Sequence, residues 1–295
     1  MSSAIVPQGP RPKTFDKSRL VVYGVLVLAS LFFLIPLWVM LMTSFKDMAE
    51  IRVGQILSLP AHFTAGAWFK AWSSACTGLT CDGIQVGFWN SIRILVPSVI
   101  LSIALGGLTG YAMTFYRVPG ANLLFAILLI GAFIPYQVFI YPMVRVFSVI
   151  GIYDSLTGIV VVHIVFGLSL MVLLFRNYFS SLPIELFNAA RVDGAGFYRI
   201  LWHVILPMSA PIIIVATILQ VTGIWNDFIL GLTFAGRVNR PMTVLLNNIV
   251  NSTQGEAAYD VDMAATILTA LVPLVVYFAS GRWFVRGVAA GAVKG

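Results

Sequence analysis

Six long stretches of the chain contain almost only apolar residues, and polar segments separate them. The stretches cover residues 20–45, 94–116, 118–144, 155–175, 204–226 and 263–281. Each approaches or exceeds the ~20 residues that an α-helix needs to cross a bilayer. Because lipid offers no partner to exposed backbone groups, these continuously apolar runs are expected to be helices rather than strands. The pattern predicts an all-α membrane protein with six transmembrane helices.

The composition agrees with this prediction, since 59% of the residues are hydrophobic and only 10% are charged. We expect one transmembrane domain over residues 20–295, preceded by an N-terminal arm, 1–19. The arm carries four basic residues, as a signal peptide would. The apolar run after it is too long for a signal peptide and no small-residue cleavage site follows, so it is interpreted as a retained first span.

The distribution of charge predicts the orientation of the chain. With the N-terminus in the cytoplasm, the cytoplasmic segments hold eleven basic and three acidic residues, whereas the outer segments hold seven basic and eight acidic residues. Basic residues concentrate on the cytoplasmic side of membrane proteins, so both termini are expected there. The net charge of +7 therefore reflects topology. Membrane lipid is the expected surrounding, and no nucleic-acid partner is expected.

Cys76 and Cys81 lie close together in the first outer segment, residues 46–89. In an oxidising compartment the two can form a disulfide, and two free thiols are the alternative. In the same segment Trp68, Phe69 and Trp72 have the spacing of a short helix. No histidine or second cysteine pair stands nearby, so no metal site is expected.

Residues that would support catalysis or ion coupling are missing. No G-x-x-x-x-G-K-[ST] phosphate loop is present, so the chain itself is expected to bind no ATP. His62, His163 and His203 lack the spacing of metal ligands or of a catalytic triad. The six runs carry no ionised group at mid-depth, which disfavours an ion-coupled carrier. His163 is interpreted as forming an interhelical hydrogen bond, with a proton relay or a solute contact as alternatives.

The cytoplasmic segment 176–203 has a pattern that predicts structure of its own. Pro183 and Glu185 favour the start of a short helix. Gly194, in the sequence DGAG, can take the positive φ that ends that helix. Helical spacing resumes at Tyr198 and leads through Pro207 into the fifth apolar run. We expect a stiff helix–turn–helix rather than a slack linker.

This segment resembles the cytoplasmic signature of permease subunits of ATP-binding-cassette (ABC) importers, E-A-A-x3-G-x9-I-x-L-P. The matching positions, with every gap correct, are Asn188, Ala189, Ala190, Gly194, Val204, Leu206 and Pro207. Asn188 replaces the glutamate of the signature and removes a carboxylate that in the family pairs with the ATPase. Glu185 stands about one turn earlier and is the candidate substitute. Val204 in place of isoleucine changes little.

Motifs elsewhere extend the resemblance to nearly the whole chain. TSFK (43–46), NSIRI (90–94), GYA (110–112), WNDF (225–228) and GAVKG (291–295) resemble the maltose-permease G-type branch of bacterial carbohydrate importers. The resemblance implies the type I importer permease fold in the inner membrane, with this chain as half of the pore. The partners it implies are a second permease in a heterodimer, an ATPase dimer that binds ATP and Mg²⁺, and an extracytoplasmic sugar-binding protein.

The resemblance also implies which residues carry the function. The candidates for coupling to the ATPase are Glu185, Asn188, Ala189, Ala190, Arg191, Asp193, Gly194 and Pro207. Trp225, Asn226 and Asp227 are candidates for the outer end of the pathway, although an interfacial aromatic belt is the preferred interpretation of Trp225. The tail, 282–295, resembles a segment that touches the ATPase dimer, and a positive-inside anchor is the alternative.

Two alternatives to a sugar permease stay open from the sequence. An importer of another small polar solute, such as glycerol phosphate or a polyol, would have the same architecture. Tyr136, Phe139 and Tyr141 suit stacking on a sugar ring, but packing explains them equally well. A non-transporting membrane scaffold would explain the six spans. It would not explain why the cytoplasmic segment carries the spaced loop signature.

Overall fold

The computed structural model describes residues 17–78, 80–251 and 257–292, and the regular structure in these ranges is helical. Four helices are long and apolar enough to cross a membrane: α1 (Lys17–Thr43), α4 (Gln85–Phe115), α7 (Leu156–Ser180) and α14 (Tyr259–Ala292). Two bent helix pairs supply the remaining spans if each pair is counted as one. The all-α membrane fold is confirmed, and the count of six depends on these two pairs.

The third apolar run is not one straight helix, which corrects the expectation for residues 118–144. It contains α5 (Ala121–Phe133) and α6 (Gln137–Val149), which are bent by 111°. Ile134 lies between them with ψ of 128° and is therefore extended. A proline disfavours helical backbone at the residue before it, and Pro135 follows Ile134 directly. The break is thus encoded by a single proline inside an apolar run.

The fifth apolar run is also bent. The helix that leads into it consists of α9 (Phe197–Ile200) and one π-helical turn, η1 (Leu201–Ile205), and continues in the run as α10 (Leu206–Met208), followed by α11 (Ala210–Trp225). The segment Phe197–Met208 makes an angle of 78° with α11. Pro207 and Pro211 lack the N–H groups that a continuous helix would need at this place, which explains the break.

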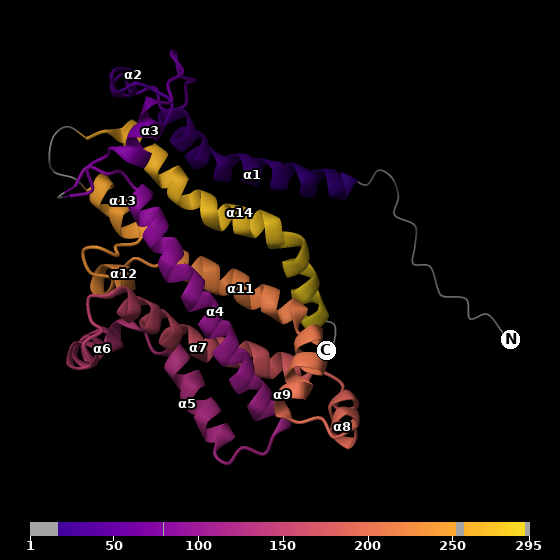
Figure 1. The fold of residues 1–295 in the computed structure, drawn as a ribbon. Helices are drawn as coiled ribbons and strands as arrows, with labels where there is room; N and C mark the ends of the chain where they lie inside the picture. The colour runs from indigo at the N-terminus through magenta and orange to yellow at the C-terminus, as the bar shows by residue number, and fades with distance from the viewer. Residues whose placement is uncertain (1–16, 79, 252–256, 293–295) are drawn as a thin grey trace.

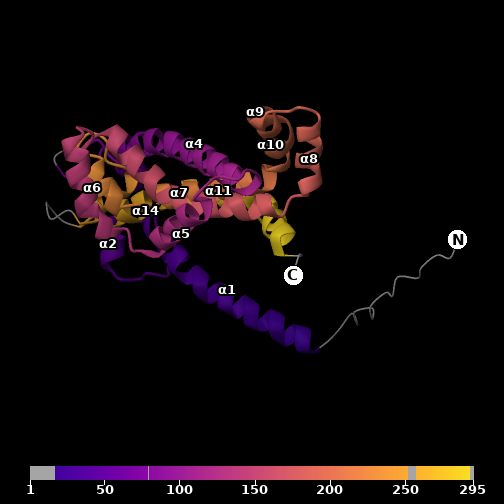
Figure 2. The same ribbon diagram turned by 90° about the horizontal axis from the view of Figure 1, so that it is seen from below.

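The two ends of the bundle match the predicted topology. Figure 1 shows the start of α1, the end of α14 and the helices α8 (Ile184–Val192) and α9 at one end. At the opposite end lie α2 (Met48–Arg52), α3 (Gly66–Ser73), which contains the predicted aromatic helix, α12 (Ile229–Phe234) and α13 (Met242–Val250). Figure 2 shows that α1 leaves the bundle at an angle, and its apolar side chains are exposed along most of its length.

The close packing of α4 against α7 lies at the centre of the fold. α4 places small residues at every fourth position, and all are buried: Ser98, Ser102, Gly106 and Gly110. A Cβ atom at position 106 would overlap the Cβ of Met171, and one at position 110 would lie 2.9 Å from the backbone nitrogen of Arg176. Small residues let helix backbones approach closely in a membrane. Glycine is needed at both positions because α7 occupies the space.

Two of the sequence motifs fasten the outer segments to the bundle. Lys46 of TSFK is buried, and its Nζ donates hydrogen bonds to the carbonyl oxygen of Gln55 (2.8 Å) and to Ser58 Oγ (2.9 Å). Asn90 of NSIRI donates from its side-chain amide to two carbonyl groups between α12 and α13, at 2.8 and 3.2 Å. These motifs therefore have a structural role at the outer end.

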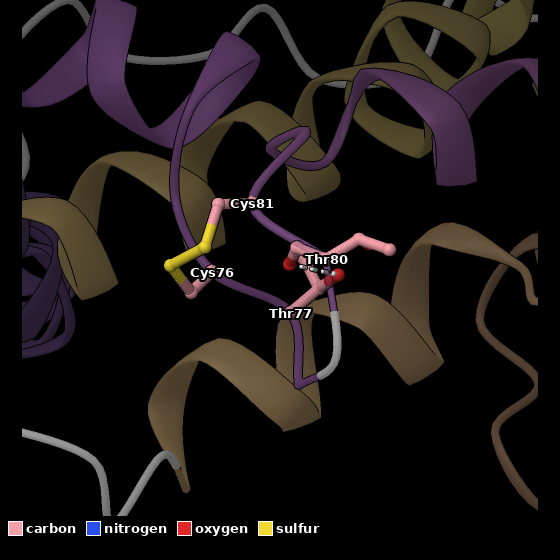
Figure 3. Close-up of a disulfide and its surroundings, with 4 residues drawn as sticks. All are labelled: Cys76, Thr77, Thr80 and Cys81. Carbon is pink, nitrogen blue, oxygen red and sulfur yellow. Dashed lines mark hydrogen bonds between the residues drawn. A yellow bond between two sulfur atoms is a disulfide. The ribbon is translucent and has the colours of Figure 1, made fainter.

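Cys76 and Cys81 are joined in a disulfide, the first of the two alternatives that the sequence left open (Figure 3). The bond closes a short loop in which the Thr77 amide donates to the carbonyl oxygen of Thr80 at 2.8 Å. Asn248 of α13 donates from its side chain to the Thr77 carbonyl oxygen at 2.9 Å. The disulfide loop is thereby attached to α13.

We expect Gly106→Ala to lower the free energy of unfolding by about 1–3 kcal/mol, because overpacking pushes α4 and α7 apart. Gly107→Ala is the matched control, since its new Cβ would meet the Phe175 ring at 3.7 Å, an ordinary contact. Thermal unfolding of both variants in detergent measures the difference. Equal unfolding midpoints would contradict the tight contact between the two helices.

Candidate functional site: the coupling loop and the outer pocket

The short helix and turn predicted in the cytoplasmic segment are present. α8 begins after Pro183, whose backbone is extended, and ends at a turn in which Gly194 has φ of +77°. The amide of Ala195 donates to the carbonyl oxygen of Ala190 at 3.0 Å and closes the helix end. No atom lies within 4 Å of a Cβ built on Gly194, so glycine is required there by the backbone conformation alone.

One face of this coupling loop, residues 176–203, is anchored to the bundle by aromatic side chains. The ring of Phe187, buried beneath α8, stacks on Phe115 with the centroids 4.7 Å apart. The ring of Phe197 lies 4.8 Å from that of Tyr111, whose hydroxyl donates to the Phe197 carbonyl oxygen at 3.1 Å. Tyr111 and Phe115 end α4, so the loop is fixed to the central helix. Phe187 is not among the residues predicted from the sequence, although an aromatic residue in a short polar helix was a usable signal.

The other face of the coupling loop is exposed. The predicted coupling residues that lie exposed on it are Glu185, Asn188, Ala189, Arg191, Asp193 and Gly194, and Ala190 is half-buried. Leu186 is exposed beside them, and Val192 is 87% exposed. Exposed apolar side chains bordered by charges are typical of a protein-binding surface. Pro207 lies apart from this face, in α10, where the chain bends toward α11.

A second candidate site is a pocket of about 350 Å³ between α7, α11 and the segment that follows α11. Its polar lining is Tyr136, His163, Gln220, Asn226 and Asp227, and its apolar lining is Phe166, Gly167, Gly223, Ile224 and Leu230. We call it the outer pocket, because α12 and the end of α11 lie toward the outer end of the bundle (Figure 1).

His163 and Asp227 face each other across the outer pocket. His163 Nε2 and Asp227 Oδ2 are 3.9 Å apart, too far for a hydrogen bond. The carboxylate instead accepts the amides of Leu230 (3.3 Å) and Gly231 (2.8 Å), which fixes it at the start of α12. Burial raises the pKa of the Asp227 carboxyl, and these two hydrogen bonds oppose that shift. His163 therefore lines the pocket without a direct hydrogen bond to Asp227.

Trp225 does not occupy the position expected of it. Its side chain is 1% exposed, and its indole nitrogen donates to the carbonyl oxygen of Thr269 in α14 at 2.9 Å. Trp225 therefore joins α11 to α14 inside the bundle, and its assignment to an interfacial aromatic belt is wrong. It is not part of the outer pocket either, whereas Asn226 and Asp227 are.

The expected tail contact and candidate metal ligands concern other parts of the chain. The contact expected of the tail, 282–295, lies outside the residues whose side chains the structure describes. Among the side chains that the structure describes, in residues 19–78, 80–251 and 257–281, no three of His, Cys, Asp or Glu come together as a metal site would require.

Comparisons with known proteins agree on one family. Residues 102–290 match the model of the binding-protein-dependent transport system inner membrane component. The osmoprotective compounds uptake permease protein GgtD of Synechocystis sp. is 35% identical over 73% of this chain and 72% of its own length. The alpha-glucoside transport system permease protein AglG of Rhizobium meliloti is 33% identical over 83% of this chain and 64% of its own length.

A solved structure has the same fold. It is the crystal structure of a bacterial ABC transporter involved in the import of the acidic polysaccharide alginate, with a TM-score of 0.76 and 21% identity. The match covers 93% of this chain and 99% of the other. The family match spans well over half of the chain and includes the coupling loop. The chain therefore belongs to the binding-protein-dependent transport system inner membrane components: it is a multi-pass inner-membrane permease subunit of an ABC importer and is not itself an enzyme.

Proposed function

We propose that this permease imports a carbohydrate and forms the pore as a heterodimer with a second permease. The name of its relative AglG, an alpha-glucoside transport permease, supports this substrate class, as do the motifs shared with carbohydrate importers. A sugar-binding protein on the outer side delivers the solute, and a dimer of ATPase subunits binds ATP and Mg²⁺. Another small polar solute is the second candidate, since the relative GgtD takes up osmoprotective compounds.

The observation that carries the ATPase-driven part of this proposal is the two-sided coupling loop. On its buried side, Phe187 packs against Phe115 at the end of α4. On its exposed side, Ala189 and the residues around it are free to enter a groove of an ATPase subunit. A stiff element held by the bundle on one side and by the ATPase on the other transmits ATPase closure to the membrane helices.

The exposed residues have distinct tasks in this coupling. Ala189 and Ala190 allow close approach of the groove because their side chains are small, and Gly194 holds the turn at a positive φ. Glu185 provides the carboxylate that Asn188 lacks, and it is exposed and available to a basic residue of the ATPase. Arg191 and Asp193 contribute further charges at the rim of the contact.

We expect Gly194→Val to abolish uptake while the membrane helices stay folded. A β-branched residue at φ of +77° costs about 1–2 kcal/mol and distorts the turn. Gly196→Val is the matched control, because Gly196 has φ of −79° and is equally free of neighbours within 4 Å. ATP-dependent uptake by the reconstituted importer is measured, with mass identification of the ATPase and second permease that co-purify. If Gly194→Val transported as well as Gly196→Val, the coupling assignment would be lost.

We expect Phe187→Ala to uncouple ATP hydrolysis from transport. Removing a buried phenylalanine costs about 3–5 kcal/mol, and here the loss frees the loop from α4. Phe187→Leu is the control, since it keeps most of the apolar volume. The readouts are the amount of solute taken up per ATP hydrolysed and the rate of tryptic cleavage after the exposed Arg191. An unchanged ratio and cleavage rate in Phe187→Ala would argue against the aromatic anchor.

A further inference from the structure

The outer pocket contains polar groups that the coupling mechanism does not use. Gln220 is 7% exposed, and no hydrogen-bond partner reaches its Nε2 atom among the described residues. This amide lies directly against Gly167, where a Cβ would overlap it. A buried amide without a partner costs free energy, and beside it His163 Nε2 and Asp227 Oδ2 face each other at 3.9 Å, without a direct hydrogen bond. The pocket is therefore incomplete without an additional polar partner.

We propose that the outer pocket binds hydroxyl groups of the transported solute and that this solute is an uncharged, polyhydroxylated molecule. The inference rests on the proposed import function and adds to it the chemistry of the solute and the part of this chain that contacts it. A hydroxyl group both donates and accepts hydrogen bonds. One hydroxyl oxygen about 2.8 Å from each atom can bridge His163 Nε2 and Asp227 Oδ2, which are 3.9 Å apart.

The rest of the lining suits such a solute. The rings of Tyr136 and Phe166 lie 5.7 Å apart and provide an apolar wall for the C–H face of a ring. Gln220 adds an amide with donors and an acceptor. The volume of about 350 Å³ falls within the ~300–1,000 Å³ range of small-molecule sites. A few polar groups on a largely apolar wall are the usual composition of these sites.

The charges of the lining favour a neutral solute. No lysine or arginine lines the outer pocket, so a phosphate or carboxylate solute would have no opposite charge to bind. Asp227 is the carboxylate of the lining, and its oxygens accept hydrogen bonds from the amides of Leu230 and Gly231 and keep lone pairs for a hydroxyl donor. Among the candidates, a sugar or polyol therefore fits better than glycerol phosphate.

The entrance of the pocket is open enough to be tested by substitution. Gly223 and Asn226 are exposed at its edge, and no atom lies within 4 Å of a Cβ built on Gly223. Gly223→Leu therefore adds an apolar side chain at the entrance, and its Cβ meets no neighbouring atom. Gln220→Leu removes the amide at nearly constant volume, and the Nε2 atom that it removes has no hydrogen-bond partner among the described residues.

The test uses the complete importer, with its ATPase dimer, second permease and binding protein, reconstituted in liposomes. The probes are radiolabelled glucose, maltose and trehalose as neutral polyhydroxylated solutes, glycerol 3-phosphate as the anion and glycine betaine as a zwitterion without hydroxyl groups. Gly131→Leu is the matched control, since Gly131 lies in α5, outside the pocket lining, and also has no atom within 4 Å of its Cβ. Uptake and ATP hydrolysis are measured together.

We expect the intact importer and Gly131→Leu to take up at least one neutral sugar. Gly223→Leu should transport it at least tenfold more slowly, and Gln220→Leu should move several-fold less sugar per ATP. ATP hydrolysis stimulated by the binding protein should persist in both, because the coupling loop is unchanged. Normal uptake by both pocket variants would overturn the pocket assignment and leave the carbohydrate importer standing.

Two other results would overturn more of the argument. Uptake of glycerol 3-phosphate or glycine betaine in place of the sugars would contradict the neutral, polyhydroxylated solute. No ATP-dependent uptake of any probe by the intact importer would overturn both this inference and the proposed function.

Discussion

The close contact between α4 and α7 is the constraint on which the other parts of this structure depend. Lipid tails are as apolar as leucine, so helices in a membrane associate through contact area and hydrogen bonds rather than through the hydrophobic effect. Gly106 and Gly110 make that area large because they let the two backbones meet. Once α4 is fixed against α7, both of its ends have fixed positions: Tyr111 and Phe115 hold the coupling loop, and Asn90 holds the connection between α12 and α13.

The same helix pair links the two candidate sites. α7 carries His163 in the outer pocket and Phe179 in the aromatic cluster beneath the coupling loop. A displacement of the loop that moves this cluster therefore acts on the helix that forms one wall of the pocket. Asp227, on the opposite wall, follows α11, which begins at the bend beyond Pro207. The two walls of the pocket are thus connected to the coupling loop in different ways. One wall, α7, is connected through Phe179, and the other, α11, through the bend that precedes it.

The features of the fold that the lipid environment requires, above all the helical spans, could be predicted from the sequence. Apolar runs of sufficient length must be helical in a bilayer, and the DGAG turn requires glycine at position 194, so these features are readable one segment at a time. The bends at Pro135 and between α10 and α11 were missed because average hydropathy contains no information about direction, although the prolines that cause them stand in the sequence. Trp225 was misplaced for a related reason, since a tryptophan is compatible with the interface and with the interior.

Some site residues could be predicted from a local sequence signature, and others only from the tertiary structure. The coupling loop was found because its signature is local, whereas Phe187 shows its role only when α4 is present beneath it. The outer pocket brings together residues from α7, α11 and the break before α6, which are far apart along the chain. The sequence placed no ionised group inside the spans, and only the tertiary structure places Asp227 opposite His163.

The Cys76–Cys81 bond has a consequence for the order in which this protein is made. Thiols stay reduced in the cytoplasm, so the pair can be oxidised only after the segment between α1 and α4 has crossed to the other side. The bond then keeps a loop that contacts α13, which is synthesised much later, in a closed shape. An oxidised Cys76–Cys81 pair therefore shows that α1 and α4 of the nascent chain were inserted with the segment between them on the outer side.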